Sequence, residues 1–140
     1  MIKKSVVSYS VQLLIKHPEL DPEEITNTIG MKPTKSWKRG DPVTTPTGLL
    51  VGGVHSDSSW SYSDSIHMEM EAGHFDTIEK LINQMYDKRA FFSKIKSSGS
   101  RLEFVLIFYD GEYISAEIAP EHLQKLCELG FSLGVLVTAN

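Results

Sequence analysis

The residues best suited to hold a metal ion lie near the middle of the chain. His67, Glu69 and Glu71 alternate along a segment with a strand pattern, which places their side chains on one face. His74 follows three residues later, and imidazole and carboxylate groups in such a set could ligate a divalent ion. The solvent-facing side of an antiparallel sheet carries the same residue types for solubility alone. We adopt this second interpretation and expect no metal site.

A basic turn around a tryptophan is the next candidate. Lys32, Lys35, Lys38 and Arg39 surround Trp37. Basic residues interleaved with an aromatic ring could hold a phosphate or stack a nucleic-acid base. The alternative is a tryptophan packed over a sheet edge, with the lysine stems lying along the surface. We favour this alternative, because a short charge run is usually a solvated face.

The sequence lacks the arrangements that activate a nucleophile. It contains no G-x-S-x-G motif, and the serines of residues 56–65 have no positioned base. No glycine pattern matches a phosphate-binding loop. Cys127 falls on the apolar stripe of a predicted helix, which indicates a buried thiol. We therefore expect no catalytic residue and no cofactor, and the sequence favours a non-enzymatic protein without excluding an enzyme.

The composition is typical of a globular protein. Its 140 residues are 41% hydrophobic and 23% charged, which fits one domain over residues 1–140. The net charge of −4 gives no general attraction for nucleic acid or an anionic membrane. A single cysteine cannot form an internal disulfide, and no apolar run reaches the ~18 residues of a membrane helix. We expect a cytoplasmic protein that does not span a membrane.

Local patterns predict the elements of the N-terminal half. Apolar residues at odd positions from 7 to 15 indicate a half-buried strand, and a second alternation runs from residue 60 to 70. A helix of residues 22–29 has Asp21 as its N-cap and Gly30 at its end. Residues 43–51 are typical of a small hairpin, and we expect a mobile loop from Gly52 to Ser59.

The C-terminal half shows helical and strand patterns in turn. An apolar stripe predicts a helix of residues 76–86, followed by a further helical turn. The apolar run 102–109 indicates a central strand, and Asp110-Gly111 predicts a hairpin that returns through residues 112–118. A last helix begins at Pro120, with an inner face of Leu123, Leu126 and Cys127, and a closing strand follows at 131–137. The order β-α-β-α-β-β-α-β predicts a single α+β domain with a mixed, largely antiparallel sheet and helices packed on it.

Four motifs together resemble a known family. They are DPEEIT at residues 21–26, Gly30 with Pro33, the turn KRGD at 38–41, and Trp60 at the start of a strand. This combination resembles the bacterial family called domain of unknown function 4279, over most of the chain. The resemblance implies a small bacterial α+β domain and brings no established catalytic residues.

Our leading hypothesis is a bacterial, cytoplasmic protein-binding module of the immunity or adaptor type. Its candidate binding residues are Trp37, Lys38, Arg39 and Trp60, beside the segment 43–59. One alternative is a small anionic-ligand binding protein or enzyme with a pocket near Trp37, Arg39 and Trp60. Another is a nucleic-acid accessory protein, and a homodimer is also possible. A pocket lined by both tryptophans favours a ligand, whereas a flat or convex apolar surface favours a protein partner.

Overall fold

A computed structural model describes residues 7–63, 68–70, 76–109 and 117–138. The elements in chain order are β1 (Val7–His17), α1 (Pro22–Ile29), β2 (Lys35–Trp37), β3 (Pro42–Thr44), β4 (Leu50–Val54), β5 (Ser58–Ser63), β6 (Met68–Met70), α2 (Asp76–Tyr86), α3 (Arg89–Ser97), β7 (Arg101–Tyr109), α4 (Pro120–Leu129) and β8 (Phe131–Thr138). They confirm the predicted α+β class. None of the described helices is both long and apolar enough to cross a bilayer.

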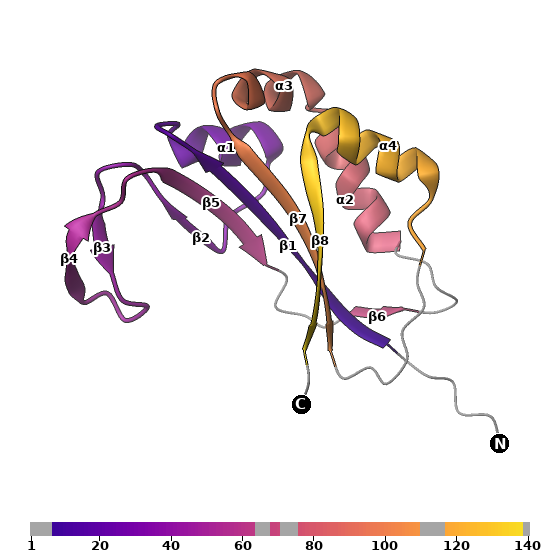
Figure 1. Cartoon of the computed structure of the whole chain (residues 1–140), viewed down its shortest axis with the longest axis horizontal. Coiled ribbons are helices and arrows are strands. Elements are labelled where there is room, and N and C mark those ends of the chain that lie inside the picture. The colour runs from indigo at the N-terminus through magenta and orange to yellow at the C-terminus, as the bar shows by residue number, and fades with distance from the viewer. Residues whose placement is uncertain (1–6, 64–67, 71–75, 110–116, 139–140) are drawn as a thin grey trace.

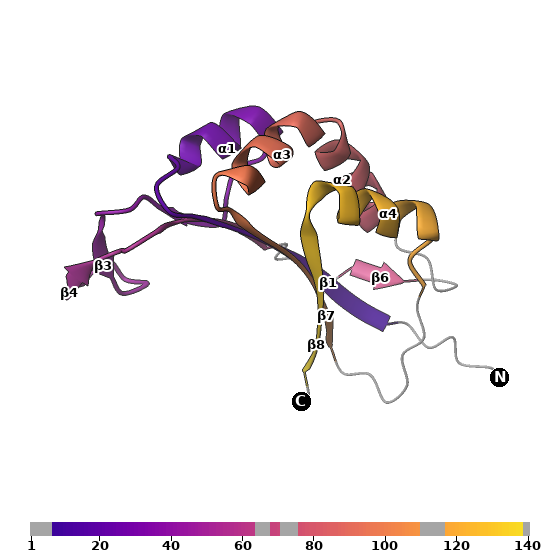
Figure 2. The same ribbon diagram turned by 45° about the horizontal axis from the view of Figure 1, so that its top comes forward.

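The described strands form a main sheet and a separate ribbon. The six-stranded main sheet has the order β2-β5-β1-β7-β8, with β6 also paired to β1. Its strand pairs are antiparallel except β7 with β8, which run parallel. Helices α1 to α4 lie on one face of this sheet (Figure 2). Strands β3 and β4 form the two-stranded ribbon, which stands apart beyond the ends of β2 and β5 (Figure 1).

The core lies between the helices and the inner face of the main sheet. The alternation predicted for the first strand is confirmed, because four of its odd-numbered side chains are at most 2% exposed: Tyr9, Val11, Leu13 and Ile15. Ile15 pairs with Trp60 on one side and with Leu102 on the other. Trp60 and Leu102 are also buried, at 0% and 2% exposed. Burial of such side chains stabilises the fold by roughly 1.5–3 kcal/mol each.

Helix α1 begins and ends where the sequence predicts. The Asp21 carboxylate accepts a hydrogen bond from the Glu23 backbone N–H at 3.0 Å. Gly30 has φ +77°, and its N–H donates to the Thr26 carbonyl at 2.8 Å. Ile25 and Ile29 turn toward the core, so the helix packs over β5.

The prediction of a mobile loop from Gly52 to Ser59 is wrong, because most of this segment belongs to strands. Gly52 and Gly53 belong to β4, and Ser58 and Ser59 belong to β5. His55 between the strands accepts from the Gly40 N–H and donates to the Asp41 carbonyl, both at 2.9 Å. The segment is held by backbone partners some fifteen residues away, which local composition does not reveal.

The predicted return of the chain after β7 falls largely on residues that the structure does not describe. Residues 110–116, with the Asp110-Gly111 turn, lie outside the described residues. Strand β7 already pairs with β1 on one side and with β8 on the other. The connection from β7 to β8 includes α4, and a parallel pair of strands needs a crossover of this length.

The inner face of α4 differs from the predicted one. His122, Leu126 and Leu129 are buried, whereas Leu123 is 42% exposed and Cys127 is exposed. Histidine counts as a polar residue in a sequence pattern, so His122 was not expected on the inner face. Its ring nevertheless packs between α4 and α2, with Nδ1 3.7 Å from the carboxylate of Glu79. The helix is therefore turned by about one residue relative to the prediction, and Cys127 is not a core residue.

Candidate functional site

The basic turn of residues 38–41 is closed by its own backbone. The Asp41 N–H donates to the Lys38 carbonyl, and the Lys38 N–H donates to the Asp41 carboxylate, both at 2.9 Å. Gly40 has φ +90° at the third position, where a type II turn favours glycine. The Arg39 N–H donates to Ser58 Oγ at 3.0 Å, which fixes the turn to β5 and leaves the Arg39 side chain exposed.

Trp37 lies next to this turn, at the end of the edge strand β2. Its indole stacks on the His55 ring, with the centroids 4.2 Å apart and the planes 13° from parallel. Lys35 Nζ lies 5.2 Å from the indole centroid, within the range of a cation–π interaction. The indole Nε1 is buried and has no hydrogen-bond partner among the described residues. Ring packing therefore holds Trp37 without help from its polar atom.

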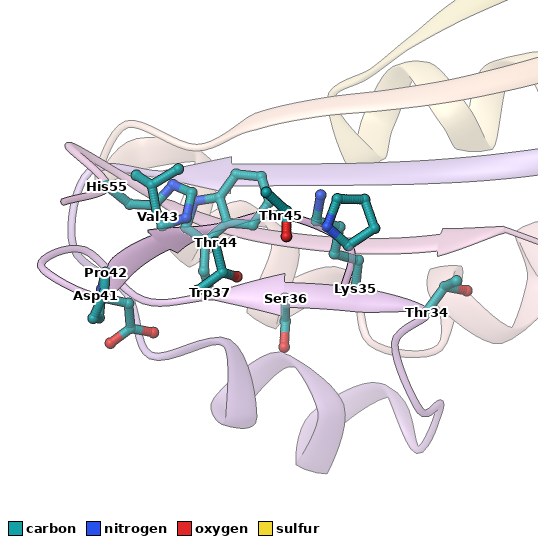
Figure 3. Close-up of a pocket in the computed structure, with 11 residues that line it drawn as sticks. Thr34, Lys35, Ser36, Trp37, Asp41, Pro42, Val43, Thr44, Thr45 and His55 are labelled. Atoms are coloured by element: carbon teal, nitrogen blue, oxygen red, sulfur yellow. The ribbon is translucent and has the colours of Figure 1, made fainter. Parts of the chain in front are cut away.

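An open hollow of about 780 Å³ lies beside Trp37. Lys35 and Trp37 line it from β2, Val43 and Thr44 line it from β3, and His55 closes it from the segment after β4. Figure 3 shows Val43 and His55 beside the indole. The hollow thus lies between the main sheet and the ribbon, and its lining mixes apolar and hydroxyl groups with one lysine, one histidine and the carboxylate of Asp41.

Trp60 is not part of this hollow. Strands β2 and β5 pair Ser36 with Trp60 and Trp37 with Ser59, so the two tryptophans lie on opposite faces of the sheet. Trp60 is 0% exposed, and its Nε1 donates to Thr26 Oγ1 of α1 at 3.0 Å. The predicted surface that contains both tryptophans is therefore not formed, and Trp60 belongs to the core.

Only one of the basic side chains in and before the turn forms an ion pair with a described residue. Lys38 Nζ lies 3.9 Å from the Asp21 carboxylate, in an exposed pair worth at most about 1 kcal/mol. Lys32 and Arg39 are exposed and form no ion pair with a described residue. The hollow itself is lined by one cation and one carboxylate, Lys35 and Asp41, so the unpaired basic side chains lie outside it.

The ribbon and its connecting turn carry four large apolar side chains that are more than half exposed. Leu49, Leu50, Val51 and Val54 are 67%, 73%, 57% and 63% exposed. Two paired strands cannot bury both of their faces without a second layer, which the described residues do not provide here. Sequence reasoning found the hairpin and missed both this exposure and His55. The sequence did indicate the exposed apolar side chains, because Leu49-Leu50-Val51 is an apolar run between turn glycines.

The residues weighed as candidate metal ligands form no described cluster. His67, Glu71 and His74 lie outside the described residues, and Glu69 lies in β6, where only the backbone is described. Among the side chains that are described, no group of three histidine, cysteine or acidic residues could hold a metal ion.

Comparison with models of known protein families shows to which family the chain belongs. The model of the family described as "Domain of unknown function (DUF4279)" matches residues 7–140. The chain belongs to the DUF4279 family. No curated protein and no solved structure matches it. The DUF4279 match spans the basic turn, the hollow and the ribbon, so all three lie within the family's domain.

Proposed function

We propose that this DUF4279 protein is a non-enzymatic binding module of the bacterial cytoplasm, of the immunity or adaptor type. It binds a partner protein through the ribbon and the adjoining basic turn. The observation that supports this proposal is the exposure of Leu49, Leu50, Val51 and Val54 on an element that projects from the body. Exposed apolar surface of this kind, rimmed by polar residues, is typical of protein interfaces.

The charges beside the ribbon define the chemistry of the partner. Arg39 is exposed and forms no ion pair with a described residue, and Lys35 lies over the indole of Trp37. A partner segment with apolar side chains and flanking carboxylates would cover the ribbon and pair with these cations. Apolar contacts would then supply affinity, and the charges at the rim would speed association and orient the partner.

A small anionic ligand in the hollow is the second candidate. Its support is the stack of Trp37 on His55 with Lys35 above the indole, in a space of about 780 Å³. This volume lies within the range of small-molecule sites. The hollow is open and contains only one of the two tryptophans, which makes this candidate weaker than protein binding.

Capture from the native cell tests the proposal, with mass spectrometry of the retained proteins. We expect one acidic protein to bind the wild type and to be lost from Leu50→Asp, whose side chain is 73% exposed in the ribbon. Truncation of an interface hot spot costs about 2 kcal/mol or more, close to a thirtyfold loss of affinity. The purified partner should show this loss by calorimetry.

The matched control is Leu123→Asp, because Leu123 is an exposed apolar residue on α4, at 42%. It should keep the partner, and both variants should melt as the wild type does. Equal capture of the partner by the two variants would show that the ribbon does not bind it. Saturable binding of a phosphorylated metabolite, lost on Lys35→Ala, would favour the second candidate.

A further inference from the structure

Strand β8 forms one edge of the main sheet. It pairs with β7 in an unbroken parallel register, from Leu102 with Phe131 to Tyr109 with Thr138. No described strand pairs with its other side. An edge of this kind presents a row of unpaired backbone N–H and C=O groups, on which another strand can be added.

The side chains of β8 lack the usual protection of an edge strand. The sequence FSLGVLVT contains no charged residue and no proline, and its register shows no bulge. Four large apolar side chains along it are 41–62% exposed: Leu133, Val135, Leu136 and Val137. The opposite edge differs, since β2 has three residues, includes Lys35 and follows Pro33. Charge, proline and short length are the features that keep edges from pairing.

We propose that β8 pairs in the antiparallel sense with β8 of a second copy of this chain. The resulting dimer has two-fold symmetry and one continuous sheet through both copies. A second copy fits this edge because the strand carries no charge, so self-pairing brings no like charges together. An isologous interface also needs only one self-complementary patch, and β8 provides one.

Symmetry limits the register of this pairing. A two-fold axis normal to the sheet keeps each face on its own side, so opposed residues have both odd or both even numbers. The central registers therefore place Val135 opposite itself or Gly134 opposite itself. The helix-side face of β8 carries Phe131 and, further along, Leu133, Val135 and Val137. In either register, these last three side chains contact the equivalent three side chains of the other copy. Helices of both copies then lie on the same side of the joined sheet.

Sedimentation equilibrium of the purified full chain tests this inference. We expect the wild type to be a dimer at micromolar concentrations and Val135→Lys to be a monomer. Val135 is 62% exposed, so lysine is tolerated in the monomer. The two lysines lie directly opposite or diagonal to each other in the two central registers, and their repulsion should raise the dimer dissociation constant about a hundredfold. The matched control Leu50→Lys places lysine at an apolar site on the ribbon that is 73% exposed, and it should remain dimeric.

A mixing experiment separates the dimer axis from a general effect of charge. Val135→Glu alone should also be monomeric, and an equimolar mixture with Val135→Lys should form a heterodimer. Circular dichroism should show that both variants are folded. A monomeric wild type, a dimeric Val135→Lys variant, or failure of the folded variants to associate on mixing would each overturn the inference. None of these results bears on partner capture by the ribbon.

Discussion

The two tryptophans show how the same side chain takes different roles at different sites. Trp60 is 0% exposed and donates its indole N–H to Thr26, so its polar atom is satisfied inside the core. Trp37 is half-buried, stacks on His55 and leaves its indole nitrogen without a partner among the described residues. Both burial and the hydrogen-bond partner of the indole therefore distinguish the structural tryptophan from the surface one.

Replacing each tryptophan by phenylalanine should change the free energy of unfolding by different amounts. Trp60→Phe removes buried volume and leaves the Thr26 hydroxyl without its donor, so the free energy of unfolding should fall by about 2 kcal/mol. Trp37→Phe keeps a ring to stack on His55 and removes an unsatisfied donor, so its effect should be within about 0.5 kcal/mol. Urea denaturation measures both. Equal losses would show that Trp37 is as much a part of the core as Trp60.

At the scale of elements, local interactions define α1 and long-range pairing defines its neighbours. The N-cap, the first-turn proline and the left-handed Gly30 all act within ten residues. Strand β2, in contrast, depends on its pairing with β5, and the ribbon is tied by backbone bonds between the 38–41 turn and His55. Elements of the first kind form from local sequence, whereas those of the second kind require the sheet to be in place.

The cap of α1 can be separated from its ion pair. Asp21→Ala should lower the free energy of unfolding by about 1 kcal/mol, because the Glu23 N–H loses its acceptor. Asp21→Asn retains a capping oxygen and removes only the charge that faces Lys38, so it should unfold near the wild-type midpoint. The urea denaturation midpoints of the wild type and the two variants separate the contribution of the cap from that of the ion pair. An equal loss in both variants would assign the stabilisation to the ion pair.

The whole molecule combines a well-packed body with a loosely attached ribbon. The ribbon joins the body through the Trp37 and His55 stack and the hydrogen bonds of the 38–41 turn. Amides of β3 and β4 should therefore exchange with solvent faster than those of β1 and β7, because local opening needs little apolar exposure. Native-state hydrogen exchange measures this difference. Ribbon amides as protected as those of β1 would mean that the ribbon is covered, for instance by another chain.

The sequence by itself determined the features that depend on short-range geometry. The alternation of β1, the capped helix α1, the apolar stripe of α2 and the α+β class all follow from side chains a few residues apart. The four motifs that resemble DUF4279 also pointed to the family that the match over residues 7–140 establishes. Of the candidate site, the sequence indicated the basic turn and the hairpin, which are both local structures.

Tertiary structure alone decided how these pieces face one another. A shift of one residue in strand register moves a side chain to the other face of a sheet, so the sequence could not show that Trp37 and Trp60 point in opposite directions. The burial of His122 instead of Cys127 depends on the contact of α4 with α2, and the neighbours of β7 depend on the crossover through α4. These outcomes arise from contacts between residues far apart in the chain, and no local pattern encodes them.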